Sequence, residues 1–226
     1  MSSEGEPARA RIRDADRTRA EILDVATGEF ARAGFAGARV DEIAALTRTT
    51  KRMIYYYFGS KKKLFTAVLE RMYTTIREAE QALDVDHLDP VAAIRRLAEL
   101  TFDHHESHPE FIRLVSIENI REAEHILASA ELGRLSSPAI DVLDRILASG
   151  RAAGVFRDDV DAVDVHVLIS SFCFFRVANR HTFGALFHRD LVAGDRREHY
   201  RAMVGDMIVG YLTTTAPPAP RPGPAG

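Results

Sequence analysis

Residues 43–65 read IAALTRTTKRMIYYYFGSKKKLF, and their pattern predicts two short helices joined by a tight turn and followed by the start of a longer helix. In the second helix, about 50–57, Ile54 and Phe58 are four residues apart, so both are expected to pack inward. The remaining positions then point largely outward: Lys51, Arg52, Met53, Tyr55, Tyr56 and Tyr57. Exposed tyrosines gain nothing from water, but their hydroxyls bind phosphates and their rings contact thymine methyls, so this face predicts contact with DNA.

A lysine cluster at the next helix supports the same interpretation. Lys61, Lys62 and Lys63 stand at a helix N-terminus, where the positive end of the dipole makes each cation unfavourable by a few tenths to about 1 kcal/mol. Residues 45–66 hold six Lys or Arg and no Asp or Glu. Opposite a DNA backbone this cluster forms a phosphate clamp. Alone, a tyrosine stripe is more often core and a lysine run more often a solvated surface, but their combination favours DNA binding.

The composition is that of an ordinary globular protein, with 46% hydrophobic and 28% charged residues. The net charge of −3 is uneven, because residues 1–66 carry 13 Lys and Arg against 9 Asp and Glu while the rest of the chain is acidic. The single Cys173 lies among phenylalanines and predicts a buried, reduced thiol in a cytoplasmic protein. From the polar, Arg-rich start of the sequence and the polar residues in its longest apolar stretch, we expect neither a signal peptide nor a membrane span.

The rest of the chain predicts helices throughout, and therefore an all-α fold of about nine helices. Apolar spacing and caps place them at about 17–33, 40–46, 50–57, 61–83, 89–107, from 109, 137–154, 161–181 and 195–212. Four parts are expected: a mobile basic arm over 1–16, a three-helix helix-turn-helix domain over 17–66, an effector-binding and dimerisation domain over 67–214, and a disordered tail over 215–226.

The region 43–65 resembles the TetR family of bacterial transcriptional regulators. The matching residues are Ile43-Ala44, the run from Ile54 to Leu64, and the upstream Gly34-Phe35. The resemblance implies that Tyr55, Tyr57 and Lys61 contact phosphates and that four further side chains read base edges. These four are Lys51, Arg52, Met53 and Tyr56.

This chain departs from the family pattern at two places. The turn is Thr47-Arg48-Thr49, where the family has Ala-Gly-Val, and Arg39 replaces a capping Thr or Ser. A non-glycine residue in a left-handed turn position costs about 1–2 kcal/mol, so either Arg48 strains the turn or the turn differs. Both arginines can reach phosphates. The complete expected DNA-binding set is Arg39, Arg48, Thr50, Lys51, Arg52, Met53, Tyr55, Tyr56, Tyr57 and Lys61.

The C-terminal helices are expected to form a homodimer and to bind an effector. The helix at 163–181 is apolar nearly all round and should be buried on every side, by its own domain and by a partner. Phenylalanines supply apolar walls, and a few polar side chains supply anchors for an apolar or aromatic molecule with one polar handle. The expected lining is Phe102, His105, Phe111, Asn119, His166, Phe172, Phe175, Arg176, Asn179 and Phe187.

The function expected from these features is a repressor that a small molecule releases from a near-palindromic operator on double-stranded DNA. An alternative is a structural or partner-recruiting DNA-binding protein without an effector. An enzyme is not expected, because Ser170, Ser171 and His181 lack a nucleophile elbow. His104, His105 and His108 suggest a metal site, but a structural zinc needs four ligands and no pattern supplies them, so no metal or cofactor is expected.

Overall fold

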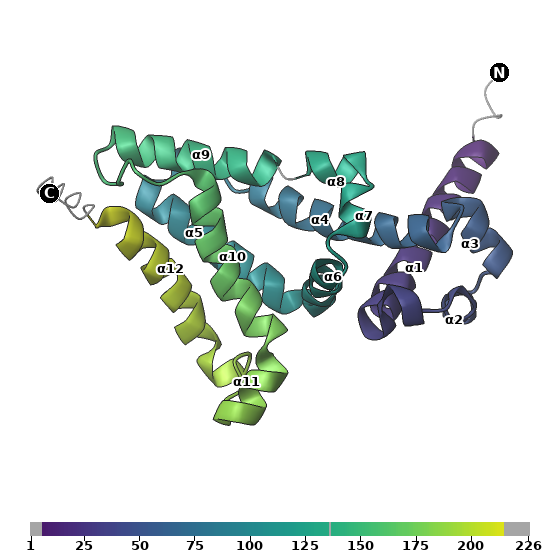
Figure 1. The fold of residues 1–226 in the computed structure, drawn as a ribbon. Coiled ribbons are helices and arrows are strands. Elements are labelled where there is room, and N and C mark those ends of the chain that lie inside the picture. The colour runs from purple at the N-terminus through teal and green to yellow at the C-terminus, as the bar shows by residue number, and fades with distance from the viewer. Residues whose placement is uncertain (1–5, 136, 215–226) are drawn as a thin grey trace, which may run out of the picture. The chain divides into compact units, whose positions relative to one another are not determined.

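The computed structural model describes residues 6–135 and 137–214, and every regular element within these ranges is helical (Figure 1). This confirms the predicted all-α fold. The α-helices are α1 (Glu6–Gly37), α2 (Val40–Leu46), α3 (Lys51–Phe58), α4 (Lys61–Gln81), α5 (Pro90–Ser107), α6 (Pro109–Ile120), α7 (Glu124–Leu127), α8 (Ala130–Arg134), α9 (Ser137–Ala152), α10 (Ala162–Ala178), α11 (Arg180–Phe187) and α12 (Arg197–Thr213). Short 3-10 helices cover Val85–His87 and Gly194–Arg196.

The first helix begins earlier than the sequence pattern predicts. It starts at Glu6 rather than Arg17, so residues 6–16, expected as a mobile arm, are helical. This segment is rich in alanine and arginine, which are strong helix formers even without apolar periodicity. The helix was expected to end at about residue 33. The structure has a break there, at Gly34 with φ 70° and ψ 173°, a conformation that a glycine adopts without steric cost, and helical residues continue to Gly37.

The apolar helix near the C-terminus is shorter than expected. It was predicted to reach His181, but α10 ends at Ala178 and α11 continues at an angle of 69°. At the junction both the backbone amide and the side chain of Asn179 donate to the carbonyl of Phe175, at 2.9 and 3.3 Å. Among the described residues, no single helix is both long enough and apolar enough to span a membrane. Only the bent pair of α10 and α11 meets both criteria when the two helices are taken together.

The chain forms two compact units, each described here by itself. Unit 1 comprises Met1–Ile76 and His108–Ser136, and unit 2 comprises Arg77–Ser107 and Ser137–Gly226. The segment with α6, α7 and α8 thus joins the unit that contains the predicted helix-turn-helix. The functional boundaries after residues 66 and 214 stay predictions, and the tail over 215–226 lies outside the described residues.

The core of unit 1 is aromatic. Phe30 and Phe65 are fully buried, and their rings meet edge to face with centroids 4.9 Å apart. Ile43 from α2 and Ile54 from α3 are also fully buried. These contacts fix α2 and α3 on α1 and α4, and they leave the other faces of α2 and α3 open to solvent.

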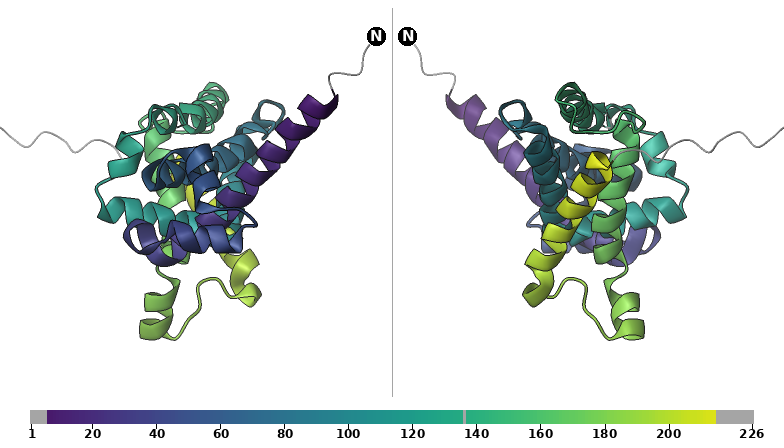
Figure 2. Two further views of the ribbon diagram at one scale, coloured as in Figure 1. Left: turned by 90° about the vertical axis from the view of Figure 1, so that its right-hand side faces the viewer. Right: turned by 90° about the vertical axis from the view of Figure 1, so that its left-hand side faces the viewer.

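Unit 2 is a bundle of α5, α9, α10 and α12. Its core includes Phe102, Leu143, Val165 and Ile208, all nearly inaccessible to solvent. Helices α5 and α12 approach closely at Gly205, where a Cβ atom would lie 2.7 Å from Nη1 of Arg95. Figure 1 shows α11 at the end of the unit where α10 ends and α12 begins, and both views in Figure 2 show α11 projecting from that end.

Candidate DNA interface and effector pocket

Helix α3 is oriented as its sequence predicts. The Thr50 hydroxyl accepts a hydrogen bond from the Met53 amide at 3.3 Å and so caps the helix. Ile54 and Phe58 are buried, which confirms the predicted inward face. On the other face Tyr56 is 78% exposed, an unusual state for a large ring in a folded protein. Lys51, Arg52, Met53 and Tyr55 are also exposed, whereas Tyr57 is half-buried.

Two of the predicted cations have defined neighbours within unit 1. Lys51 Nζ lies 3.0 Å from the Asp41 carboxylate, which joins α3 to α2. Lys61 Nζ donates to the carbonyl of Ala36 at 3.3 Å and lies 5.1 Å from the centre of the Phe35 ring. Both lysines are therefore held by weak exposed contacts that a phosphate can replace at little cost.

The turn between α2 and α3 differs from the family pattern, and Arg48 does not strain it. Among the described non-glycine residues, positive φ angles occur at Glu122, Ala123 and His188, but not at Arg48. Instead Thr47 is buried and its hydroxyl donates to the carbonyl of Ile43 at 2.8 Å. Of the two alternatives, a strained Arg48 or a different turn, the structure has the different turn: Thr47 leaves the helix in an extended conformation, so no left-handed residue is needed.

Arg39 occupies the N-cap position of α2 without a side-chain cap, as its lack of a hydroxyl predicts. Arg39 and Arg48 are both exposed. The ten predicted DNA-binding residues all belong to unit 1, and the elements that carry them are α2, the following turn, α3 and the start of α4. Their contacts with DNA stay a prediction.

Unit 2 contains a pocket of about 390 Å³ between α10, α11 and α12. Three predicted effector residues line it: Phe172, Phe175 and Arg176. Five other residues line the pocket and were not predicted from the sequence: Ser171, Phe183, Leu191, Tyr200 and Met207. Phe183 was missed because α11 was not predicted, although an aromatic residue four positions beyond Asn179 was a signal for a further helix.

Arg176 is the main polar group at this pocket, and it is only 3% exposed. Its Nη1 donates to the Leu191 carbonyl at 2.7 Å, and its Nη2 donates to the Glu106 carboxylate. The guanidinium lies 3.9 Å from the centre of the Phe102 ring. Its Nε is buried without a hydrogen-bond partner. A buried unsatisfied donor is costly.

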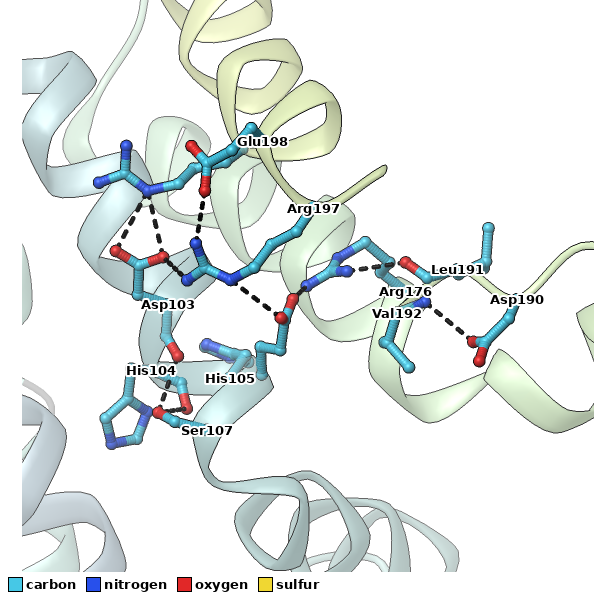
Figure 3. Close-up of polar contacts among 12 residues, drawn as sticks. Asp103, His104, His105, Ser107, Arg176, Asp190, Leu191, Val192, Arg197 and Glu198 are labelled. Carbon is cyan, nitrogen blue, oxygen red and sulfur yellow. Dashed lines mark hydrogen bonds and ion pairs between the residues drawn. The ribbon is translucent and has the colours of Figure 1, made fainter. Parts of the chain in front are cut away.

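A network of ion pairs surrounds Glu106. Arg197 Nε lies 3.1 Å from Glu106, and Arg197 Nη2 lies 2.5 Å from Asp103 (Figure 3). Arg201 lies 3.1 Å from Asp103 and 3.0 Å from Glu99. The carboxylates of α5 are thus matched by arginines from α10 and α12.

The other predicted effector residues do not line this pocket. Phe102 lies beneath Arg176, and Phe187 is exposed at the end of α11 with its ring 4.5 Å from that of Phe183. Three further residues of unit 2 lie elsewhere: His105, His166 and Asn179. Phe111 and Asn119 belong to unit 1. In the described part of the chain, no group of three or more His, Cys, Asp or Glu side chains is arranged to hold a metal ion.

The capped α3 helix with its exposed tyrosines and cations, set against α2 across a tight turn, defines a helix-turn-helix DNA-binding protein. Comparison with known families identifies which kind. Residues 22–68 match the family described as bacterial regulatory proteins, tetR family, and residues 90–208 match the tetracyclin repressor-like C-terminal domain. The chain belongs to the TetR family, whose members are DNA-binding transcriptional regulators and not enzymes.

Two curated relatives are named as repressors. The chain is 39% identical over 202 residues to the HTH-type transcriptional repressor NicS of Pseudomonas putida, covering 89% of this chain and 95% of that protein. It is 35% identical over 159 residues to the HTH-type transcriptional repressor SCO4008 of Streptomyces coelicolor, covering 70% of this chain and 77% of that protein.

Solved structures share the fold. The crystal structure of SCO4942 from Streptomyces coelicolor superimposes with a TM-score of 0.65 at 30% identity, covering 84% of this chain and 97% of that one. The regulator FadR from Bacillus subtilis, in complex with stearoyl-CoA, gives a TM-score of 0.64 at 16% identity, covering 85% of this chain and 98% of that one. The second likeness shows the fold alone.

Proposed function

We propose that this protein is a homodimeric transcriptional repressor that binds a near-palindromic operator in the cytoplasm and is released from it by a small-molecule effector. The observation that carries the DNA-binding part is α3, whose exposed face combines Tyr56 with cations. Repression is the activity named for the relatives NicS and SCO4008.

Dimerisation is supported by an exposed apolar stripe on unit 2. Val163, Val167 and Phe175 recur at four- and eight-residue spacing on α10, and the first two are 53% and 57% exposed. Met207 and Tyr211 form a similar pair on α12 and are also exposed. Large apolar side chains in such a row are expected to be covered, and a second copy of the same surface satisfies this by two-fold symmetry.

The proposed effector site is the pocket at Arg176. Its apolar lining and its single unsatisfied donor suit an apolar or aromatic molecule with one hydrogen-bond acceptor, such as a carbonyl or carboxylate. Ser171, Phe175 and Met207 line the pocket, and they continue the stripe on α10 and α12. A ligand here would change the packing of the dimer face.

The proposed release is geometric. A helix-turn-helix dimer binds successive major grooves only when its recognition helices lie roughly 34–36 Å apart. A ligand that alters the dimer face alters this separation. A coupling of about 1–3 kcal/mol between ligand and DNA is enough for a useful switch. That FadR was crystallised with stearoyl-CoA is consistent with a ligand site in this fold.

The test is a selection of bound fragments from the genome of the source organism, followed by ligand titration on the selected duplex. A panel of aromatic acids, fatty acids and their neutral amides should contain a compound that raises the melting temperature and weakens DNA binding in one titration. If the protein selects a duplex but no compound has either effect, the structural or partner-recruiting alternative replaces the effector part. If no duplex is selected, the whole proposal fails.

A conservative variant links any such ligand to the pocket. Arg176→Lys keeps a cation for Glu106 but removes the unsatisfied Nε, so it should weaken ligand binding while the protein still binds DNA. The matched control is Arg180→Lys, because Arg180 is a half-buried residue of α11 outside the pocket lining, where it pairs with Asp190. Equal ligand affinity in both variants would place the site elsewhere.

A further inference from the structure

The turn between α6 and α7 in unit 1 has a backbone that its sequence does not explain. Glu122 and Ala123 have φ angles of 55° and 60°, two consecutive left-handed residues without a glycine. Left-handed backbone is unfavourable for residues with a Cβ, and it persists only where surrounding contacts enforce it. The contacts that enforce this turn come from two buried side chains.

These side chains are Glu118 of α6 and His125 of α7, which are 1% and 0% exposed. The carboxylate of Glu118 accepts two hydrogen bonds from His125. One comes from the backbone amide at 3.0 Å, and the other joins ring Nδ1 to the carboxylate at 2.8 Å. The carbonyl of Glu118 also accepts from the Ala123 amide at 2.8 Å. Glu118 thus closes the turn at both of its ends.

The His125 ring in turn contacts the DNA-binding part of unit 1. Its centroid lies 4.6 Å from that of Phe35, near the C-terminal end of α1, and 4.7 Å from that of Phe65 on α4. Lys61 rests on the Phe35 ring, 5.1 Å from its centre, and bonds the adjacent Ala36 carbonyl. The turn also reaches Lys62 directly, because Glu124 lies 3.3 Å from Lys62 Nζ.

Folding stability alone does not explain why Glu118 and His125 form a buried pair at this turn. A buried charged or polar pair is often matched or exceeded in stability by apolar residues of similar volume. The Nε2 atom of His125 is buried against the phenylalanine rings without a hydrogen-bond partner, which is a further cost. A directional contact that fixes one geometry is what such a pair supplies and an apolar filling does not.

We propose that Glu118 and His125 are positioning residues of the DNA interface. They hold the turn so that Phe35 and Glu124 fix Lys61 and Lys62 in place for DNA phosphates, while neither Glu118 nor His125 contacts DNA. This inference rests on the proposed function, because it assumes that Lys61 binds phosphate. It adds a determinant of operator affinity that lies outside the helix-turn-helix.

The test uses Glu118→Gln and His125→Phe in the full-length protein, with the duplex that the wild type selects from genomic DNA. Each variant should weaken binding about tenfold, and the double variant should be little worse than either single one. The salt dependence of binding should fall by about 1 per subunit, as in Lys61→Ala, because the same phosphate contact is lost. Loss of stability in a folded dimer would leave this slope unchanged.

Two further variants make the test specific. Phe35→Leu removes the ring on which Lys61 rests but leaves the buried pair intact, and it should reproduce the lower affinity and slope. His87→Phe removes an exposed histidine of unit 2 that pairs with Asp84 at 2.6 Å, and it should bind as the wild type does. This control removes a histidine that pairs with a carboxylate, as in the tested pair, but it lies in unit 2 and not in the turn between α6 and α7.

The outcomes are distinct. Wild-type affinity and slope in folded Glu118→Gln and His125→Phe overturn the positioning role. So does unfolding of both Glu118→Gln and Phe35→Leu at temperatures where the wild type is folded, because the contacts would then serve the fold itself. If Lys61→Ala binds normally, the assumed phosphate contact is wrong. If the wild type binds no duplex, the proposed function has failed instead.

Discussion

Lys61 shows how a single side chain of this interface is prepared for its ligand. Its ammonium lies over the Phe35 ring and donates to one carbonyl. Neither of these partners is a carboxylate, so they do not neutralise the positive charge of Lys61. Lys51 differs, because Asp41 lies within 3.0 Å. A phosphate that approaches Lys61 displaces only a neutral acceptor, whereas one that approaches Lys51 competes with an anion.

We therefore expect Lys61→Ala to weaken operator binding by about tenfold and to lower the salt slope by about 1 per subunit. Tyr55→Phe, which removes one hydroxyl, should weaken binding in the same direction. Fluorescence anisotropy at several salt concentrations measures both effects. Lys63→Ala removes an equal charge from the same helix end and should have the smaller effect. Unchanged binding in Lys61→Ala and Tyr55→Phe would refute the proposed docking.

His166 provides a pH-dependent contribution to stability. Burial and the nearby charge of Arg77 lower its pKa below the ordinary value of 6.5. The folded protein therefore resists a protonation that the unfolded chain accepts. The stability that this provides is present above pH 6.5 and is lost as the pH falls towards the lowered pKa.

His166→Gln should thus reduce the drop in melting temperature between about pH 8 and about pH 5. The comparison variant is His87→Gln, because Asp84 raises the pKa of exposed His87 and its contribution has the opposite sign. His87→Gln should not reduce the drop. Parallel melting curves for wild type and His166→Gln across this range would contradict the assignment.

Helix α10 is defined by its N-cap residue as much as by its apolar body. The Asp161 side chain accepts from the Asp164 amide at 2.8 Å, and the Asp164 side chain accepts from the Asp161 amide at 3.3 Å. This reciprocal capping satisfies two amides that have no partner within the helix. It also fixes where the exposed stripe on α10 begins.

Asp161→Ala should therefore destabilise the folded protein by about 1 kcal/mol and lower its melting temperature by about 2–4 °C. Asp158→Ala is the control, because Asp158 is an exposed carboxylate in the segment just before α10 and does not cap it. Calorimetry of both variants gives the comparison. Equal melting temperatures would show that the cap contributes nothing to stability.

Local signals explain which elements could be predicted. Thr50, Gly34 and the spacing of Ile54 and Phe58 act within a few residues, so the sequence alone predicts α3 and its exposed face. The end of α10 at Ala178 escaped prediction because no proline or glycine stands at the break. The turn at Glu122 escaped because it has no glycine and depends on a carboxylate in another helix.

Membership of the two units was not predictable from chain order. Residues 108–136 join unit 1 although unit 2 residues precede and follow them. The pocket likewise combines α10, α11 and α12, whose contacts depend on tertiary packing rather than on spacing. Sequence reasoning thus identified three lining residues on one helix and missed those that other elements contribute.

The exposed apolar stripe on α10 and α12 distinguishes an isolated protomer from a dimer. In an isolated protomer Val167 is 57% exposed, so a charged residue there meets mainly water and should cost little stability. In a two-fold symmetric interface the same charge would be buried opposite its copy, where like charges repel in a dry contact.

Val167→Glu should consequently convert a dimer into folded monomers at low micromolar concentration, measured by sedimentation with circular dichroism as the folding check. Operator affinity should fall by at least about a hundredfold, because a monomer binds one half-site rather than two. Leu88→Glu is the matched control, since Leu88 is an exposed apolar residue of unit 2 outside the stripe. It should stay dimeric and bind normally. A dimeric Val167→Glu variant with wild-type affinity would place the dimer interface on another surface and remove the proposed link between the pocket and the spacing of the recognition helices.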